Sequence, residues 1–122
     1  MAQAHIFAVE SQSETLIITP NRNIGNLSET PVQAEWQEIL NRIAAGNVRH
    51  VVFDLKFVRY LGSSMIEAML LIWKRLRRRR GRLAVCNASQ IASEILELSN
   101  LPAIWSICES RDQALAAVQS DG

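Results

Sequence analysis

The sequence has few of the residues that staple small domains or hold metal ions. Its 122 residues include only two cysteines, Cys86 and Cys108, which are too few for a disulfide framework. Each cysteine lies in an apolar segment, where a free cysteine is expected to behave as a small buried hydrophobe. His5 and His50 have no other histidine or cysteine at ligand spacing, so the sequence predicts no zinc site and no other metal site.

The sequence also lacks membrane segments and the common catalytic motifs. No run of about 20 apolar residues could cross a bilayer, and the first residues do not have the pattern of a signal peptide. We therefore expect a cytoplasmic protein that does not bind membranes. No glycine-rich nucleotide-binding motif occurs, and no G-x-S-x-G pattern surrounds Ser63 or Ser64. We expect no cofactor, no catalytic residues and no enzymatic activity.

Charge is nearly balanced over the whole chain but is unevenly distributed along it. The chain has 13 Lys and Arg against 12 Asp and Glu, for a formal charge of +1, and seven of these basic residues lie between Lys74 and Arg82. Three explanations of this basic run stay open: a solvated helix end, a contact with a protein partner, or binding to nucleic acid or anionic lipid. Because no wider basic or stacking surface accompanies it, nucleic acid is the least favoured partner.

Short apolar segments alternate with longer helical patterns, which predicts an α/β domain. Strands are expected over 5–10, 15–19, 50–55, 82–86 and 103–108, and helices over 31–45, 65–79, 91–99 and 112–119. This β-β-α-β-α-β-α-β-α order implies one domain over 1–122, with one mostly parallel sheet and helices mainly on one face. Each helix is expected to begin at a cap that is followed three residues later by Gln or Glu; these caps are Thr30, Ser64, Asn87 and Ser110.

The second predicted helix has two sides of different character. Four apolar residues cluster on the side that is expected to face the sheet: Ile66, Met69, Trp73 and Leu76. Leu71 falls among polar positions on the opposite side, so we expect its side chain to be exposed. It is either a lone surface leucine, which needs no explanation, or part of a partner contact beside Met65 and Ala68.

Residues 50–89 carry the most informative pattern in the chain. Asp54 and Leu55 end a buried strand, Val58 and Leu61 are aliphatic positions that follow it, and 62–65 (GSSM) open the next helix. That helix ends in a basic stretch and a turn, 80–83 (RGRL), which leads into another strand. The pattern resembles the STAS family, the anti-sigma-factor antagonists of bacteria and their relatives, over residues 14–119. The family opens this helix with Asp-Ser-Ser-Gly, so Gly62 and Met65 depart from it.

The resemblance implies a STAS fold and a regulatory protein that acts by binding. The partner would be an anti-sigma factor that is also a serine kinase, and binding would free a sigma factor. The serine that this kinase phosphorylates in the family falls on Ser63, with Ser64 as the less favoured candidate. The implied docking surface comprises Gly62, Ser63, Ser64, Met65, Ala68 and Leu71.

A helix start also suits a phosphate on physical grounds, because it carries the equivalent of about half a positive charge. The alternative interpretation is that both serines only cap the helix, and Ser64 with Glu67 three residues later fits a capping box. For the whole protein, two other functions stay open. One is a STAS subunit of a stressosome-like scaffold or of a lipid-transport ABC system, and the other is a sensor of a small apolar ligand.

Overall fold

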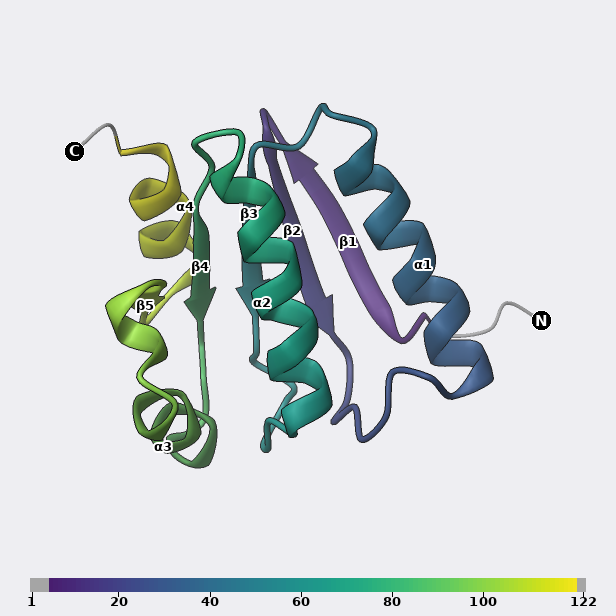
Figure 1. Ribbon diagram of the computed structural model, residues 1–122. Helices are drawn as coiled ribbons and strands as arrows, with labels where there is room; N and C mark the ends of the chain where they lie inside the picture. Colours follow the sequence, from purple (N-terminus) through teal and green to yellow (C-terminus); the bar gives the residue numbers. More distant parts are fainter. Residues whose placement is uncertain (1–4, 121–122) are drawn as a thin grey trace.

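The computed structural model describes residues 5–120, which form a five-stranded sheet packed against helices (Figure 1). The strands are β1 (Phe7–Gln12), β2 (Thr15–Pro20), β3 (His50–Asp54), β4 (Leu83–Cys86) and β5 (Ser106–Cys108). The helices are α1 (Thr30–Ala44), α2 (Ser63–Arg77), α3 (Gln90–Leu98) and α4 (Arg111–Gln119), with a short 3₁₀ helix, η1 (Leu101–Ala103), before β5. The predicted order of strands and α-helices is confirmed. Among residues 5–120, no helix combines the length and the apolar character that crossing a bilayer requires.

The strands lie side by side in chain order, β1-β2-β3-β4-β5. β1 and β2 form an antiparallel hairpin, in which Gln12 is paired with Thr15, and every later pair of neighbours is parallel. The mostly parallel sheet predicted from the strand and helix pattern is therefore confirmed. Its parallel strands all end at the same edge, which is where the loops leading into α2 and α3 begin (Figure 1).

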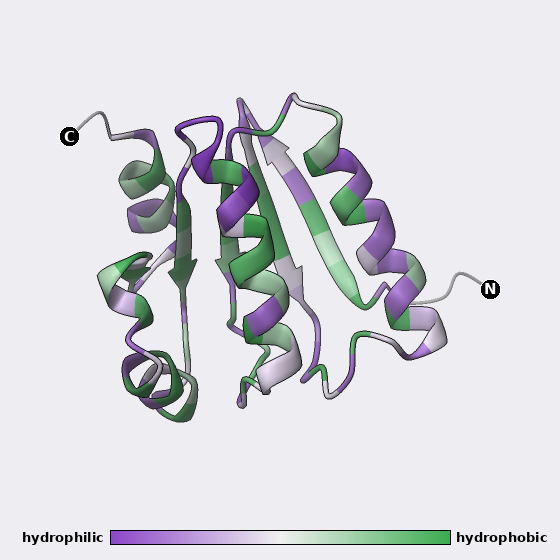
Figure 2. Ribbon diagram, in the orientation of Figure 1, coloured by the Kyte–Doolittle hydropathy of each residue, from purple (hydrophilic) through white to green (hydrophobic). Residues whose placement is uncertain are grey.

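Alternate residues of β2, β3 and β4 belong to two separate hydrophobic cores. In β3, Val51 and Phe53 pack with α1, α2 and α3 on one face of the sheet, whereas Val52 packs with α4 on the other face. The helices therefore lie mainly on one face, as expected, and α4 alone covers the opposite face (Figure 2). A shift of β3 by one residue would exchange its side chains between the two cores, so the register of this strand is tightly specified.

The predicted caps Thr30 and Ser64 are wrong. α1 begins at Thr30 itself with Glu29 as its N-cap, and α2 begins at Ser63 with Gly62 as its N-cap. Neither N-cap side chain makes a capping hydrogen bond. Because the first N–H groups of a helix have no partner within it, the start of α2 presents backbone donors that no side chain of residues 5–120 caps.

The predicted cap of α3 is displaced by two residues, whereas the predicted cap of α4 is confirmed. Ser89, rather than Asn87, caps α3, and its Oγ accepts the N–H of Ala92 at 3.0 Å. Asn87 instead has a positive φ of 56° and turns the chain just after β4. The predicted cap of α4 is confirmed, since Ser110 Oγ accepts the N–H of Gln113 at 3.2 Å.

The segment before α4 contains less strand than predicted. Leu101–Ala103 forms η1, and only Ser106–Cys108 pairs with β4. Between η1 and β5, the Trp105 side chain is buried in the main core, which is the one that packs against α1, α2 and α3. Cys108 on this strand is only half-buried, whereas Cys86 on β4 is fully buried as expected. Burial, with the neighbouring Asp54 carboxylate, raises the pKa of the Cys86 thiol to about 12, so this thiol stays protonated at neutral pH.

α2 ends in a turn that presses against the connection between α1 and β3. Arg80 donates its N–H to the carbonyl of Arg77, and Gly81 donates its N–H to the carbonyl of Leu76 at 2.7 Å, which are the two bonds of a Schellman motif. The left-handed residue of this motif is Arg80, with φ of 58°. Gly81 is needed for a different reason, since a Cβ added there would overlap the carbonyl oxygen of Arg49.

Candidate functional site

The candidate site consists of the loop between β3 and α2 and the first turn of α2. Leu55, Val58 and Leu61 are buried in the main core and anchor the inner side of the loop. Leu55 also donates its N–H to the carbonyl of Cys86 at 2.9 Å, which continues the pairing of β3 with β4. The apolar positions recognised in the sequence therefore fix where α2 begins.

Two neighbouring loops hold the outer side of the same segment. Asn23 Oδ1, from the loop after β2, accepts the N–H of Arg59 at 2.8 Å and that of Tyr60 at 3.3 Å. Ser89 Oγ, at the start of α3, donates to the carbonyl of Arg59 at 2.8 Å. The backbone just before α2 is thus held from both directions, and the site is a preformed surface rather than a free loop.

Ser63 and Ser64 differ in their surroundings. Ser63 is exposed, and its side chain makes no hydrogen bond to another residue within 5–120. Ser64 is half-buried, and its Oγ accepts the N–H of Leu27 over a long 3.5 Å. The first turn of α2 contains no acidic residue, so nothing offsets the positive end of the helix dipole there. Ser63 is the more accessible hydroxyl at this helix start.

The predicted docking surface needs correction at two positions. Met65 and Ala68 are 2% and 7% exposed, because both face the core, so neither side chain can contact a partner. Leu71 is 62% exposed, which confirms the expectation that its side chain is at the surface. Gly62 and Ser64 are half-buried, and Ser63 is exposed. The accessible part of the predicted set is therefore the helix start and Leu71.

The inward side of α2 is rotated from the predicted one. The buried residues of the helix are Met65, Ala68, Met69, Ile72 and Leu76, whereas Ile66 and Trp73 are only half-buried. Met69 and Leu76 face the core as expected. Ile66 and Trp73 still pack against this core. Because apolar residues surround most of the helix, periodicity alone does not choose between its adjacent sides.

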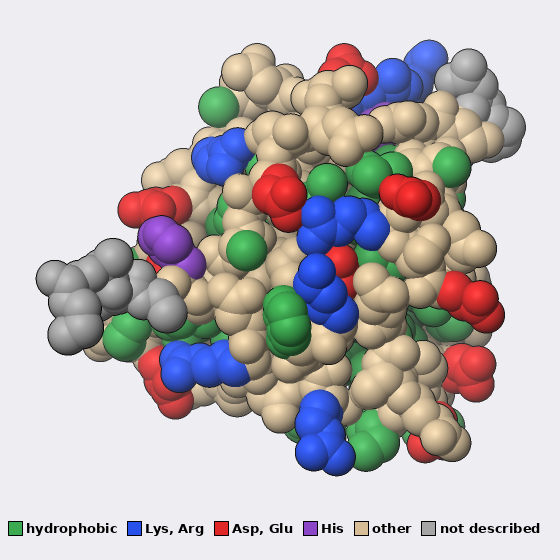
Figure 3. All heavy atoms as spheres, turned by 180° about the vertical axis from the view of Figure 1, so that it is seen from behind, with side chains coloured by type: hydrophobic (Ala, Val, Ile, Leu, Met, Phe, Trp, Pro, Cys, Tyr) green, Lys and Arg blue, Asp and Glu red, His purple; other side chains and the backbone are tan. Residues whose placement is uncertain are grey.

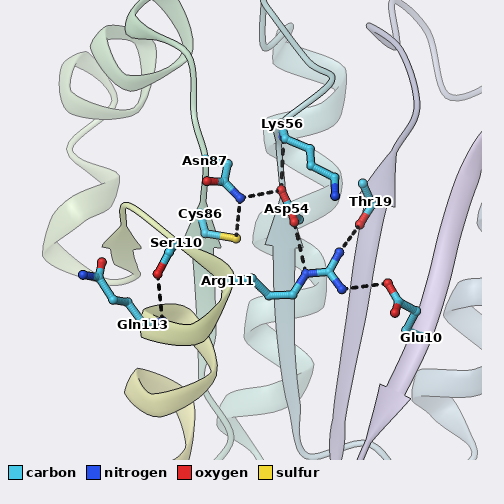
Figure 4. A network of polar contacts seen from close by, with 9 residues as sticks. All are labelled: Glu10, Thr19, Asp54, Lys56, Cys86, Asn87, Ser110, Arg111 and Gln113. Carbon is cyan, nitrogen blue, oxygen red and sulfur yellow. Dashed lines mark hydrogen bonds and ion pairs between the residues drawn. The ribbon is translucent and has the colours of Figure 1, made fainter.

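A buried polar network lies on the α4 side of the sheet, near the loop that leads to Ser63 (Figure 4). Asp54, at the end of β3, is 1% exposed. Its carboxylate accepts hydrogen bonds from Arg111 Nε at 3.1 Å, from Asn87 Nδ2 at 3.0 Å and from the backbone N–H of Lys56 at 3.2 Å. The buried charge is therefore paired and hydrogen-bonded, as a buried carboxylate must be.

Arg111 ties this network to the first two strands. Its Nη1 contacts Glu10 Oε2 at 2.8 Å, and its Nη2 donates to Thr19 Oγ1 at 3.2 Å (Figure 4). Burial by itself lowers the pKa of Arg111, but hydrogen bonds and attraction to Glu10 and Asp54 outweigh it and raise the pKa overall. The sequence pattern missed this network, although an aspartate at the end of a fully apolar strand signals that a cation must be near.

The STAS domain family model matches residues 8–114 of the chain. The chain belongs to the STAS domain family. A curated relative is BtrV of Bordetella bronchiseptica, assigned as an anti-sigma factor antagonist, which is 33% identical over 72 residues. That match covers 59% of this chain and spans 62% of the length of BtrV.

Solved structures show the same STAS fold. A Thermotoga maritima protein assigned as an anti-sigma factor antagonist has a TM-score of 0.80 at 20% identity, covering 95% of this chain and 97% of that one. The anti-sigma factor antagonist SpoIIAA in its unphosphorylated form has a TM-score of 0.74 at 22% identity, with 93% and 96% covered. The phosphorylated form of SpoIIAA, a Bacillus cell fate determinant, has a TM-score of 0.70 at 22% identity, with 93% and 99% covered.

The two departures from the STAS sequence pattern have different structural settings. At Gly62 a Cβ would meet only Tyr60 Cε1 at 3.7 Å, so there is room for a Cβ at this position. The backbone of Gly62, with φ of −81° and ψ of 164°, is open to any residue. Met65, in contrast, fills space in the core of this STAS domain. Relative to the family pattern, Gly62 removes a negative charge from the helix start. Met65 adds a side chain to the core beneath it.

Proposed function

We propose that this STAS protein is an anti-sigma factor antagonist, which binds an anti-sigma factor that is also a serine kinase and thereby frees a sigma factor. The family membership and the assignments of the BtrV and Thermotoga relatives support this role. One observation connects this role to a site: Ser63 is exposed, and its hydroxyl has no hydrogen-bond partner among residues 5–120. It lies at a helix start that neighbouring loops hold in place.

The proposed contact surface, called the α2 docking face, comprises Tyr60, Ser63, Glu67 and Leu71, all of which are exposed. Tyr60 is 57% exposed and Leu71 is 62% exposed, so each leaves a large apolar surface in water. A few aromatic and aliphatic anchors of this kind provide most of the affinity in protein interfaces. Because hydrogen bonds from Asn23 and Ser89 hold the entry loop of α2 in place, we expect little conformational entropy to be lost when a partner binds.

Phosphorylation of Ser63 would act on this face without disturbing the fold. A phosphate adds a charge of about −1.5 to −2. The unpaired N–H groups and the positive dipole at the start of α2 stabilise such an anion. The same charge would lie at one end of the α2 docking face, where it must be desolvated when a partner covers Ser63. The proposed result is a switch that lowers partner affinity while leaving the domain folded.

Incubation with ATP and the anti-sigma serine kinase of the same organism is expected to add one phosphate, on Ser63. The exposed position of Ser63 favours it over Ser64, whose Oγ lies against the loop at Leu27. Intact-mass measurement and peptide fragmentation locate the phosphate. Ser63→Ala should abolish the mass increase, and the matched variant Ser64→Ala should retain it. A phosphate on Ser64, or none on a chain that binds the kinase, would contradict the proposed switch.

The binding role itself is tested at Leu71. Leu71→Ser is expected to weaken binding to the anti-sigma factor about tenfold in isothermal titration calorimetry, because an anchor on the α2 docking face is lost. Leu98→Ser is the matched control, since Leu98 is 88% exposed on α3 and lies outside this face. Equal affinities for both variants would show that the partner does not contact α2.

A further inference from the structure

The two edges of the sheet differ in how they are closed. Within residues 5–120, β1 and β5 are each paired on one side only, but β5 has three residues whereas β1 has six. Natural edge strands are usually blocked by proline, lysine or a β-bulge, because their unpaired N–H and C=O groups can pair with another extended chain. β1 contains neither proline nor lysine, and its pairing with β2 is continuous, without a bulge. β1 is therefore the edge that can accept a further strand.

The hydrogen bonds of Phe7 show which residues of β1 face outward. Phe7 donates its N–H to Glu35 Oε1 at 3.0 Å, and its neighbour on β2 is Pro20, which has no N–H. The backbone groups of Phe7 therefore point away from β2. Because these groups alternate in direction along a strand, Val9 and Ser11 also direct their N–H and C=O groups toward the free edge.

Glu35 already supplies one end of this edge with the acceptor that an added strand would bring. Its Oε1 accepts the N–H of Ile6 at 2.9 Å as well as that of Phe7. Val9 and Ser11 have no such acceptor, because no side chain receives their N–H groups in the part of the chain that the structure describes. The middle of the edge is thus open to a new strand.

A groove of about 400 Å³ lies between β1 and α1, which run side by side at this edge of the sheet (Figure 1). Its lining includes Phe7 and Val9 on β1 and Glu35, Glu38 and Ile39 on α1. Directly opposite residues of neighbouring strands have their side chains on the same face of a sheet. Val9 packs against the main core, on the α1 side, so a residue placed opposite Val9 would direct its side chain into this groove.

The α1 wall of the groove is acidic toward Phe7. Glu38 is exposed and Glu35 is half-buried, and within residues 5–120 neither forms an ion pair with Lys or Arg. In the rear view, acidic side chains lie beside a histidine on the side of the molecule where β1 and α1 lie (Figure 3). Arg42 also lines the groove, but its Nη2 donates to Ser11 Oγ at 2.6 Å, at the other end. A cationic side chain that enters the acidic end would gain two carboxylate neighbours.

We propose that the free edge of β1 binds an extended peptide segment of a partner protein as an added antiparallel strand, with a lysine or arginine opposite Val9. That residue exchanges two backbone hydrogen bonds with Val9, and its cationic side chain enters the groove toward Glu35 and Glu38. Main-chain hydrogen bonds supply the affinity of strand addition, and the charge selects the sequence. This site does not depend on the proposed anti-sigma role.

A second copy of the chain is a poorer occupant of the same edge. Antiparallel pairing of two β1 strands would place both α1 helices on one face of the joined sheet, next to each other. Glu35 and Glu38 of the two copies would then approach one another, and like charges at an interface disfavour association. β1 also contains no lysine or arginine that could fill the acidic end of the groove.

Titration of the full chain with the peptide acetyl-Thr-Val-Lys-Val-Thr-amide, followed by amide NMR shifts, tests the proposal. We expect saturable one-to-one binding with shifts centred on residues 7–11 and 35–42. N-methylation of the peptide lysine removes the N–H that faces Val9 and should weaken binding about tenfold. N-methylation of the valine that follows alters an N–H that points away from β1, so it should change affinity less than about twofold. Equal weakening by the two methyl groups, or no saturable shifts at millimolar peptide, would overturn the proposal.

Substitutions in the chain test the strand pairing and the charge separately. Val9→Pro removes only an outward N–H, which an edge strand tolerates, and it should weaken peptide binding about tenfold while the chain stays folded. Glu38→Gln should weaken binding of the lysine peptide about threefold and leave binding of a norleucine analogue unchanged. Glu97→Gln, on the exposed side of α3, is the matched control and should alter neither.

Two results would overturn the proposal in different ways. If Glu38→Gln weakens the lysine and norleucine peptides equally, or if Glu97→Gln has the same effect as Glu38→Gln, the groove does not select a cation. Sedimentation equilibrium of the peptide-free chain should give the mass of a monomer. A dimer that Val9→Pro dissociates would instead identify a second copy as the occupant of the edge.

Discussion

Replacing Gly81 with alanine is expected to lower the free energy of unfolding by about 3 kcal/mol or more. A Cβ at this position would overlap the carbonyl oxygen of Arg49, and it would lie 2.9 Å from the carbonyl carbon of Arg49 and 3.1 Å from the Leu76 carbonyl oxygen. All three atoms belong to the backbone, so no side-chain rotation can relieve the overlap. Either the turn after α2 or the α1–β3 connection must move.

Urea denaturation followed by circular dichroism measures this loss. Gly25→Ala is the matched control, because a Cβ there would meet nothing within 4 Å. We expect this control to stay within about 0.5 kcal/mol of the parent chain. Unfolding midpoints that agree between the two variants would mean that the turn yields easily, and that Gly81 does not fix the position of Arg80 and Arg82.

Arg111→Met is expected to cost about 3 kcal/mol of stability, because it leaves the Asp54 carboxylate buried without its cation. The hydrogen bonds from Asn87 and from the Lys56 N–H would remain, but they do not neutralise the charge. The same substitution also removes the contact between α4 and β1 through Glu10. Chemical denaturation at neutral pH measures the loss.

A double-mutant cycle shows whether the pair itself is responsible. In Asp54→Asn with Arg111→Met, the loss should be smaller than the sum of the single losses by about 1 kcal/mol, since no unpaired charge is left buried. Arg42→Met is the control, because Arg42 bonds Ser11 across an exposed surface and its loss should cost little. Additive losses in the cycle would show that Asp54 and Arg111 stabilise the fold independently.

The fold could be predicted from the sequence because the apolar and polar positions of its segments match the sides that packing buries or exposes. The apolar run Val51–Phe53 is typical of a strand buried on both faces, and two cores do lie on either side of β3. The exposure of Leu71 was also predictable, because it stands among polar positions. The direction of Met65 was not, since the helix begins two residues earlier than expected and apolar residues surround most of it.

The polar networks could not be predicted, because they join residues that are distant in the sequence. Arg111 and Glu10 are 101 positions apart, and no spacing rule connects them. The same holds for the turn after α2, where Gly81 closely approaches the carbonyl of Arg49, a residue outside the basic run that composition revealed. Composition showed that cations are concentrated in one segment, but not that Arg79 within it donates to the carbonyls of Ile43 and Val48.

The length of α2 has a consequence for how the two ends of the molecule could be regulated. The helix has 15 residues, which at about 1.5 Å per residue places its ends about 22 Å apart. This is more than two screening lengths at physiological salt, where the Debye length is about 8 Å. A charge placed on Ser63 is therefore strongly screened from the arginines at the far end of α2. Unless a partner contacts both ends of the helix, a change of charge at one end has little electrostatic effect at the other. Substitutions at one end can therefore arise without altering the binding properties of the other.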